Sequence, residues 1–154
     1  MPIGNTSEQI WKKITWYCQY QERCHTEVTQ KLKLIGVWQK EQDAILCKLI
    51  EENYINEERF AIQYAGGKFR MKQWGKTKIK YALTQKGISV YNIKKALQSI
   101  PEDAYEATLL QLAQKKWKEQ KGTVIVRKRN CYNYLQQRGY ESQYITNVLK
   151  ILEQ

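Results

Sequence analysis

Apolar residues recur along this chain with the spacing of helices, and one pattern occurs three times. In each copy an apolar residue is followed four positions later by leucine, and after four more by glycine. The copies stand 51 and 52 residues apart, at Val28, Leu32 and Gly36, then Ile79, Leu83 and Gly87, then Cys131, Leu135 and Gly139. A fixed period of this length indicates one supersecondary unit used repeatedly, with each unit burying part of its apolar face against its neighbour.

Helical spacing continues on both sides of each copy, and no long stretch alternates with the period of a strand. The pattern predicts nine helices in three triplets. We therefore expect an all-α fold of three tandem three-helix repeats in an elongated, curved arrangement. The boundaries are placed at 1–55, 56–100 and 101–154.

Polar residues mark the expected helix starts. Thr6 and Gln9 have the spacing of a capping box, in which each side chain bonds the other residue's backbone N–H. Thr26, Asn56 and Ser89 are placed to cap later helices. The glycine of each copy, just after an apolar helix face, is placed to end that helix.

Three stretches are harder to interpret. Gly66-Gly67 lies inside a helical pattern and predicts a kink or a close backbone approach, because glycine disfavours helix interiors. Residues 120–129 read as a loop or a frayed helix start, since Val124-Ile125-Val126 is β-branched and follows Gly122. Three tryptophans fall on expected inner faces and are predicted to pack in the core: Trp11, Trp16 and Trp117.

Charge is distributed unevenly along the chain. The formal net charge is +11, yet residues 1–58 carry a net −2 and residues 102–154 a net +3. Residues 59–101 contain ten lysines and arginines and no carboxylate. Repulsion within such a segment disfavours a compact state, so an anionic partner is the natural compensation.

The basic residues of this segment are therefore the candidate contact residues for an anionic partner: Lys68, Arg70, Lys72, Lys76, Lys78, Lys80, Lys86, Lys94 and Lys95. For any single one, a solvated helix face is the plainer interpretation, whereas the acid-free set favours an anion-binding surface. Lys76 and Lys80 project together at i, i+4 spacing. Lys68 falls on the apolar arc of its helix and must snorkel, pair or lie past a distortion.

Supporting contacts are expected from Trp74, between Lys72 and Lys76, and from Arg127, Lys128 and Arg129, which stand near several tyrosines. Trp74 is either a wedge between helices or a ring that stacks on a base or partner side chain.

Other chemistry finds little support. The four cysteines include no CxxC pair, and their spacing with His25 matches no usual zinc pattern, so neither metal nor cofactor is expected. The basic segment has no carboxylate to hold Mg²⁺, which argues against an enzyme. Met1-Pro2-Ile3 and the residues after it lack a secretory signal, and no apolar run reaches membrane-span length. A cytoplasmic monomer without membrane contact is expected.

The middle repeat resembles the RecX family of bacterial regulatory proteins, which act on the recombinase RecA. The matching residues are Glu58-Arg59-Phe60-Ala61, Tyr64, Lys68, Trp74-Gly75, Ile79, Leu83, Lys86-Gly87-Ile88, Ile93, Ala96 and Leu97. Lys31-Leu32 with Gly36 resembles the family's first repeat, and Leu135 with Arg138-Gly139-Tyr140 resembles its third.

This resemblance implies three three-helix units that bind in the groove of the RecA–DNA filament. It further implies that the protein modulates the strand exchange, coprotease and ATPase activities of RecA in recombination and repair, with inhibition as the expected direction. The partners would be the RecA filament and single- or double-stranded DNA, with the basic residues of segment 59–101 as the RecA or DNA contacts. The acid-free middle repeat leaves open how much binding comes from DNA. The alternative is a stand-alone DNA-binding helical module that acts through this repeat.

Overall fold

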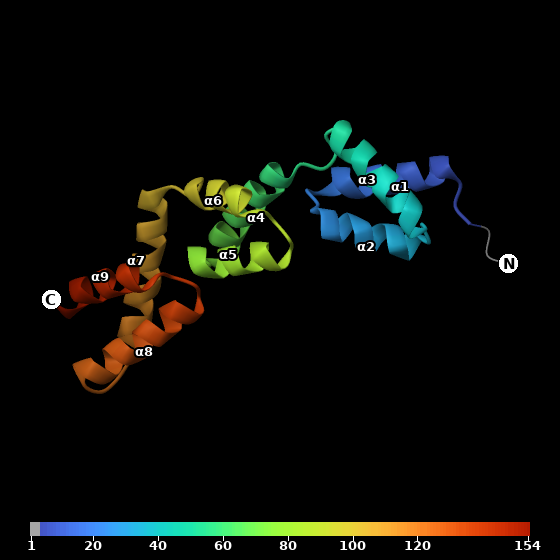
Figure 1. The fold of residues 1–154 in the computed structure, drawn as a ribbon. Helices are drawn as coiled ribbons and strands as arrows, with labels where there is room; N and C mark the ends of the chain where they lie inside the picture. The colour runs from blue at the N-terminus through green and yellow to red at the C-terminus, as the bar shows by residue number, and fades with distance from the viewer. Residues whose placement is uncertain (1–3) are drawn as a thin grey trace.

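The computed structural model describes residues 4–154, and within that range the chain is all-helical (Figure 1). Met1–Ile3, the start of the stretch from which the lack of a signal was argued, lie outside the described residues. The nine helices of this range are α1 (Ser7–Tyr20), α2 (His25–Ile35), α3 (Gln39–Glu51), α4 (Glu57–Lys72), α5 (Lys76–Gln85), α6 (Val90–Gln98), α7 (Glu102–Glu119), α8 (Val124–Gln137) and α9 (Ser142–Glu153).

The helices form three consecutive triplets in an elongated row, with α1–α3 at one end of the molecule and α7–α9 at the other (Figure 1). We call them the first unit (α1–α3), the middle unit (α4–α6) and the third unit (α7–α9). The predicted fold of three tandem three-helix repeats is confirmed. No helix among residues 4–154 combines the length and apolar character needed to cross a bilayer.

The sequence repeat corresponds to the second helix of each unit and the turn after it. Its six apolar positions are fully buried: Val28, Leu32, Ile79, Leu83, Cys131 and Leu135. The glycines end these helices with positive φ angles of 91° at Gly36, 77° at Gly87 and 99° at Gly139. Residues with a side chain are strained at positive φ angles, which explains why each copy of the repeat has glycine at this position.

Several helix starts match the sequence prediction, and that of α2 does not. Thr6 and Gln9 form the capping box, and the side chains of Asn56 and Ser89 accept the expected backbone hydrogen bonds. The second helix begins earlier than predicted, because Cys24 rather than Thr26 is its N-cap and Glu27 bonds back to the Cys24 N–H.

Residues 124–126 form the first turn of α8, so of the two interpretations of residues 120–129 the structure has the helix start rather than the loop. Thr123 caps this helix by accepting from the Val126 N–H, which offsets the weak helix preference of the β-branched residues. The helix α4 continues through Gly66-Gly67, and the atoms nearest to Gly66 belong to the side chain of Arg70 on the same helix rather than to another backbone. A Cβ on Gly66 would lie 2.7 Å from Nη1 of Arg70.

One core prediction is wrong. Trp11 and Trp117 are partly buried as expected, but Trp16 is 64% exposed. The inner face of α1 is formed by Ile14 and Cys18, and Trp16 lies two positions from each of them, about 200° around the helix axis. The exposed ring stacks on Tyr20 instead.

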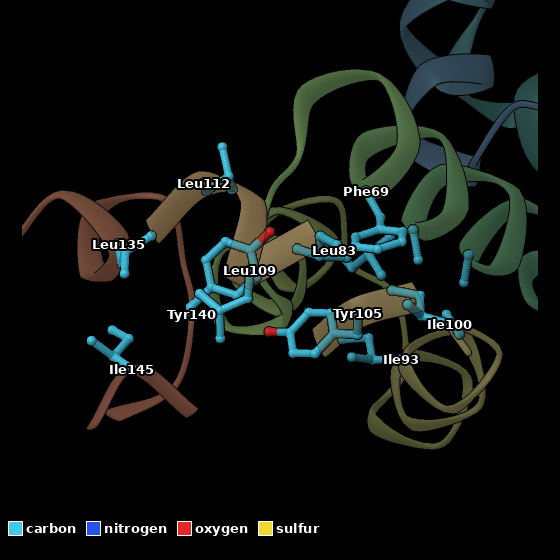
Figure 2. Close-up of a cluster of buried hydrophobic side chains, with 14 of the residues drawn as sticks. Phe69, Leu83, Ile93, Ile100, Tyr105, Leu109, Leu112, Leu135, Tyr140 and Ile145 are labelled. Carbon is cyan, nitrogen blue, oxygen red and sulfur yellow. The ribbon is translucent and has the colours of Figure 1, made fainter. Parts of the chain in front are cut away.

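The three units share two hydrophobic cores, not three. The middle and third units enclose one continuous core, in which Phe69 and Leu83 of the middle unit meet Tyr105 and Leu109 of α7 and Tyr140 after α8 (Figure 2). The first unit has a separate, smaller core around Ile14, Leu32 and Leu49. The middle and third units therefore form one body to which the first unit is attached.

Close backbone contact fixes the junction between the middle and third units. The Gly75 N–H donates to the Arg138 carbonyl at 2.8 Å, and the Thr77 N–H donates to the Gly139 carbonyl at 2.9 Å. A Cβ on Gly75 would lie 2.3 Å from the Gly139 carbonyl carbon, and one on Gly139 would lie 2.3 Å from Cβ of Lys78. The two backbones can approach this closely because both positions are glycine.

Polar contacts dominate the junction between the first and middle units. Nε of Arg59 on α4 lies 2.5 Å from a carboxylate oxygen of Glu22, and its guanidinium also donates to the Asn53 carbonyl at 3.0 Å. Cys24 is the one fully buried first-unit residue that packs into the larger core. With so little shared core, we expect the first unit to be the most easily displaced.

Candidate anion-binding surface

The nine candidate basic residues of the middle unit are distributed over all three of its helices and their turns. Four side chains are exposed to solvent: Arg70, Lys72, Lys80 and Lys94. Five are partly buried against other groups: Lys68, Lys76, Lys78, Lys86 and Lys95. These five decide how the surface is organised, because packing restricts where their ammonium groups lie.

Three lysines are brought together over two aromatic rings. Nζ of Lys68 lies 5.4 Å from the ring centre of Tyr64 and 5.1 Å from that of Trp74. Nζ of Lys78 lies 4.7 Å from the Trp74 ring, and Nζ of Lys86 lies 5.5 Å from the Tyr64 ring. We call these five residues the lysine–aromatic cluster.

The fold explains why the cluster forms. Lys68 follows Tyr64 by one helical turn on α4, so the two side chains lie on the same face. Trp74 lies in the turn to α5, and Lys78 follows it by four positions, while Lys86 ends α5. Lys68 lies on the apolar face of α4, and its side chain places the ammonium group near the Tyr64 and Trp74 rings. These cation–π contacts explain how a charged residue is accommodated on that face.

The cluster carries net positive charge without a neutralising partner. Among the residues that the structure describes, Lys68, Lys78 and Lys86 take part in no ion pair. The rings attract the ammonium groups, each contact contributing roughly 0.5–1 kcal/mol at exposed sites, but rings do not cancel charge. Burial raises the pKa of Tyr64, so its hydroxyl stays protonated at neutral pH.

Two of the nine candidates have carboxylate partners. Nζ of Lys76 lies 3.8 Å from Oε2 of Glu102 on α7 and 4.7 Å from the ring centre of Tyr105, so it is directed toward the third unit. Nζ of Lys95 lies 3.3 Å from Oε1 of Glu58. The pKa of Lys95 is raised, first by its hydrogen bond to Tyr91 and then by Glu58.

Lys76 and Lys80 were expected to project together, but the third unit covers much of Lys76. Lys80 is exposed, whereas only 20% of the Lys76 side chain is accessible. The Lys76 backbone N–H also donates to the Tyr105 hydroxyl at 2.9 Å, and that hydroxyl bonds Glu141. Lys76 is part of the junction between units.

The supporting residues do not form a single region. Trp74 packs against the core edge between Lys68 and Lys78, which matches the wedge interpretation. Arg127 lies 4.2 Å from the Trp117 ring centre, and Lys128 lies 2.6 Å from a carboxylate oxygen of Glu153. Arg129 is exposed.

Two residues of this region, Tyr64 in the cluster and Arg138 at the junction with the third unit, were not among the candidates. Tyr64 supplies one of its two rings. Arg138 donates to the Lys72 carbonyl at 2.7 Å, and its guanidinium lies 5.6 Å from the Tyr134 ring centre. The sequence marked Arg138 only as part of Arg138-Gly139-Tyr140, whereas its contact with the middle unit follows from the approach of Gly139 to Gly75, which the sequence does not specify.

A cleft next to the cluster faces the first unit. Tyr64 and Lys86 form part of one wall, and Glu22 and Glu27 lie in the lining from the first unit. Two carboxylates of the first unit thus share this cleft with Lys86, and one of them, Glu22, is bound by Arg59.

The cysteines show no arrangement for catalysis or metal binding within the described part of the chain. Cys18, Cys24, Cys47 and Cys131 are all free thiols, and residues 4–154 contain no group of three or more His, Cys, Asp or Glu side chains placed to hold a metal ion. Burial raises the pKa of the Cys18 thiol to about 11, which disfavours the reactive thiolate.

Comparison with solved structures supports the fold. The crystal structure of RecX from Lactobacillus salivarius matches with a TM-score of 0.85 and 22% identity, over 95% of this chain and 96% of that one. A second crystal structure, of a regulatory protein RecX, matches with a TM-score of 0.78 and 23% identity, over 92% of this chain and 72% of that one.

Sequence comparison gives the same family. Residues 56–97 match the second three-helix domain of RecX, and residues 103–149 match the third. Regulatory protein RecX of Bacillus mycoides (strain KBAB4) and that of Bacillus cereus (strain AH187) are each 30% identical over 138 residues, which is 89% of this chain. The chain spans about half the length of these curated relatives, 51% in each case. The domain matches, the relatives and the shared fold together show that the chain belongs to the RecX family of regulatory proteins.

Proposed function

We propose that this chain binds along a RecA–DNA filament and lowers its activity in strand exchange, with coprotease and ATPase activity reduced as a consequence. The middle unit faces anionic surface, either DNA phosphate or acidic residues of RecA, and the outer units contact successive protomers. Occupying the groove blocks access of a second DNA and of other substrates of the filament. The chain acts as a cytoplasmic monomer, without cofactor or catalysis of its own.

One observation carries this proposal above the others. The acid-free segment 59–101 places Lys68, Lys78 and Lys86 together over two rings with no ion pair among the described residues. Gathering three like charges raises the free energy of the free protein, and a dense row of anionic groups relieves that repulsion on binding. A filament supplies such a row at regular intervals.

The architecture supports binding along a track. The three units form an elongated row, and the middle and third units share one core, so they engage as one rigid surface (Figure 1). The first unit is joined through few apolar contacts and can adjust to the next protomer. Binding by a rigid pair of units loses less conformational freedom than binding by three independent ones.

The direct test is strand exchange by RecA in the presence of this protein, together with electron microscopy of filaments mixed with it. The proposal predicts slower exchange and density along the filament groove. Unchanged exchange together with bare filaments would refute it.

A second candidate function is DNA binding without RecA. The exposed Arg70, Lys72, Lys80 and Lys94 favour it, because each can reach phosphate freely. Each phosphate contact would add roughly 0.9 to the salt dependence on duplex DNA. The double variant Lys72→Ala/Lys80→Ala separates the two functions. If the chain acts by binding DNA directly, the variant should lose most of its affinity for bare duplex DNA. If it binds the filament through RecA, its affinity for the filament should change little. Lys76 is a poor choice for that test because it belongs to the junction.

A further inference from the structure

Two large aromatic rings are exposed on the first unit, far in sequence from the basic segment. Trp16 is 64% and Tyr20 is 70% exposed, one helical turn apart on α1. Their ring centres lie 5.4 Å apart with an interplanar angle of 27°, so they stack on one another. We call this pair the ring platform.

The ring platform is not needed for the fold. The core of the first unit is closed by residues from the opposite side of α1 and from α2 and α3, such as Ile14, Leu32 and Leu49. Trp11 of the same helix shows the contrast, since it packs edge-on against Tyr54 at 5.8 Å. Two exposed rings in contact form contiguous apolar surface, which is the kind of surface that marks interaction sites.

Positive charge lies beside the Trp16 ring of the platform. Trp16 borders a groove between α1 and α2 whose lining includes Lys12, Lys13 and Lys31 and no carboxylate, with the apolar Leu34 83% exposed beside it. Nζ of Lys13 is held by the Asn5 side-chain oxygen at 2.8 Å, a neutral partner that leaves its charge uncompensated. Residues 1–55, which include the whole first unit, carry seven basic and seven acidic residues, so this local excess of cations does not reflect the overall charge of the unit.

We propose that the ring platform and its lysines bind single-stranded nucleic acid, with an unpaired base stacked on the open face of the rings and the adjacent phosphates at the lysines. Planar rings beside ammonium groups match the alternation of bases and phosphates in a single strand. A duplex keeps its bases stacked inside and presents only their edges, so it cannot use the rings. An acidic peptide would satisfy the lysines but has no need of stacked rings.

This site goes beyond the filament binding proposed above, because it lies on another unit and can be measured without RecA. Binding of a fluorescein-labelled oligothymidylate is followed by fluorescence anisotropy at low salt. Trp16→Ala/Tyr20→Ala should weaken binding by about tenfold or more, the range found when stacking residues are removed. Trp38→Ala is the matched control, since Trp38 is 79% exposed in the same unit but does not line this groove. It should leave affinity within about twofold, as expected away from a binding hot spot.

Two ligands separate stacking from charge. An abasic oligonucleotide with the same number of phosphates should bind the unaltered protein about as weakly as the double variant binds oligothymidylate. A duplex should bind the unaltered protein and the double variant equally. Equal binding of oligothymidylate by both proteins, or of abasic and base-containing strands by the unaltered protein, would overturn the proposal.

Photocrosslinking covers the case in which the double variant fails to fold. An oligonucleotide that carries 5-iodouracil is irradiated with the unaltered protein, and the crosslinked peptide is found by mass spectrometry. The proposal requires attachment at Trp16 or Tyr20, and crosslinks confined to other units would contradict it.

Discussion

Replacing Gly75 by alanine should separate the middle and third units. A Cβ at this position would lie 2.3 Å from the Gly139 carbonyl carbon and 2.4 Å from the Tyr140 nitrogen. Both neighbours are backbone atoms that cannot rotate away as a flexible side chain would. The φ angle of Gly75 is −77°, so alanine suffers no strain from its own backbone, and the whole effect comes from this contact.

The size of the effect follows from what the displacement breaks. Relieving an overlap of this kind in a packed interior costs about 1–3 kcal/mol. Moving the backbones apart also weakens the hydrogen bonds from Gly75 to Arg138 and from Thr77 to Gly139, worth about 1 kcal/mol each. We expect the free energy of unfolding to fall by about 3–5 kcal/mol, a large part of the stability of a small domain.

Urea unfolding followed by circular dichroism measures the change. Gly67→Ala is the matched control, because Gly67 lies within α4 and a Cβ there would meet nothing within 4 Å. The control should become more stable by about 0.5–1 kcal/mol, the usual preference for alanine in a helix. The reasoning is refuted if Gly75→Ala unfolds at the same urea concentration as the unaltered protein.

The remaining predictions concern a buried tyrosine, a core leucine and the first junction. Burial raises the pKa of Tyr105 well above its ordinary value of about 10. The free energy of unfolding should therefore fall as pH rises above about 10, where Tyr105 ionises only in the unfolded chain. Tyr105→Phe should reduce this pH dependence, measured by urea unfolding at several pH values, and an unchanged dependence would contradict the reasoning. Leu83→Ala leaves a cavity in the core and should lower the free energy of unfolding by about 2–5 kcal/mol. Leu34→Ala, at an exposed site, should change it by less than about 0.5 kcal/mol. Equal effects of the two substitutions in urea unfolding would be inconsistent with the assigned core. Arg59→Ala removes the bridge to Glu22 and should speed amide exchange in α1 and α2 but not in α7; unchanged exchange would show that other contacts hold the first unit.

Sequence periodicity predicted the parts of the fold that depend on local geometry. The spacing of Leu32, Leu83 and Leu135 placed the second helix of each unit, because a helix brings residues four apart onto one face. The glycines after them marked the turns because a positive φ angle strongly favours glycine. Both signals lie within about ten residues of chain.

Properties that depend on two distant segments were not predictable. Nothing near Lys76 shows that Glu102 and Tyr105 will lie against it, since that contact comes from the packing of the third unit. The prediction that Trp16 packs in the core is wrong because it lies about 200° around the helix axis from Ile14 and Cys18, which form the inner face of α1. The sharing of one core by two units likewise depends on the approach of Gly75 to Gly139, which the repeat alone does not specify.

The central claim is that lysines gathered on the middle unit bring the protein to an anionic filament. Cosedimentation with RecA–DNA filaments over a range of salt concentrations tests it in two variants that remove the same charge. The first is Lys68→Gln/Lys78→Gln/Lys86→Gln in the cluster. The second is Lys40→Gln/Lys118→Gln/Lys121→Gln, at exposed sites on the outer units. The account predicts weaker binding and a shallower salt dependence for the cluster variant alone, with the slope reduced by up to roughly 0.9 for each phosphate that the variant no longer neutralises. Equally weakened binding in both variants would show that net charge, not the cluster, drives binding, and unchanged binding in both would contradict the account.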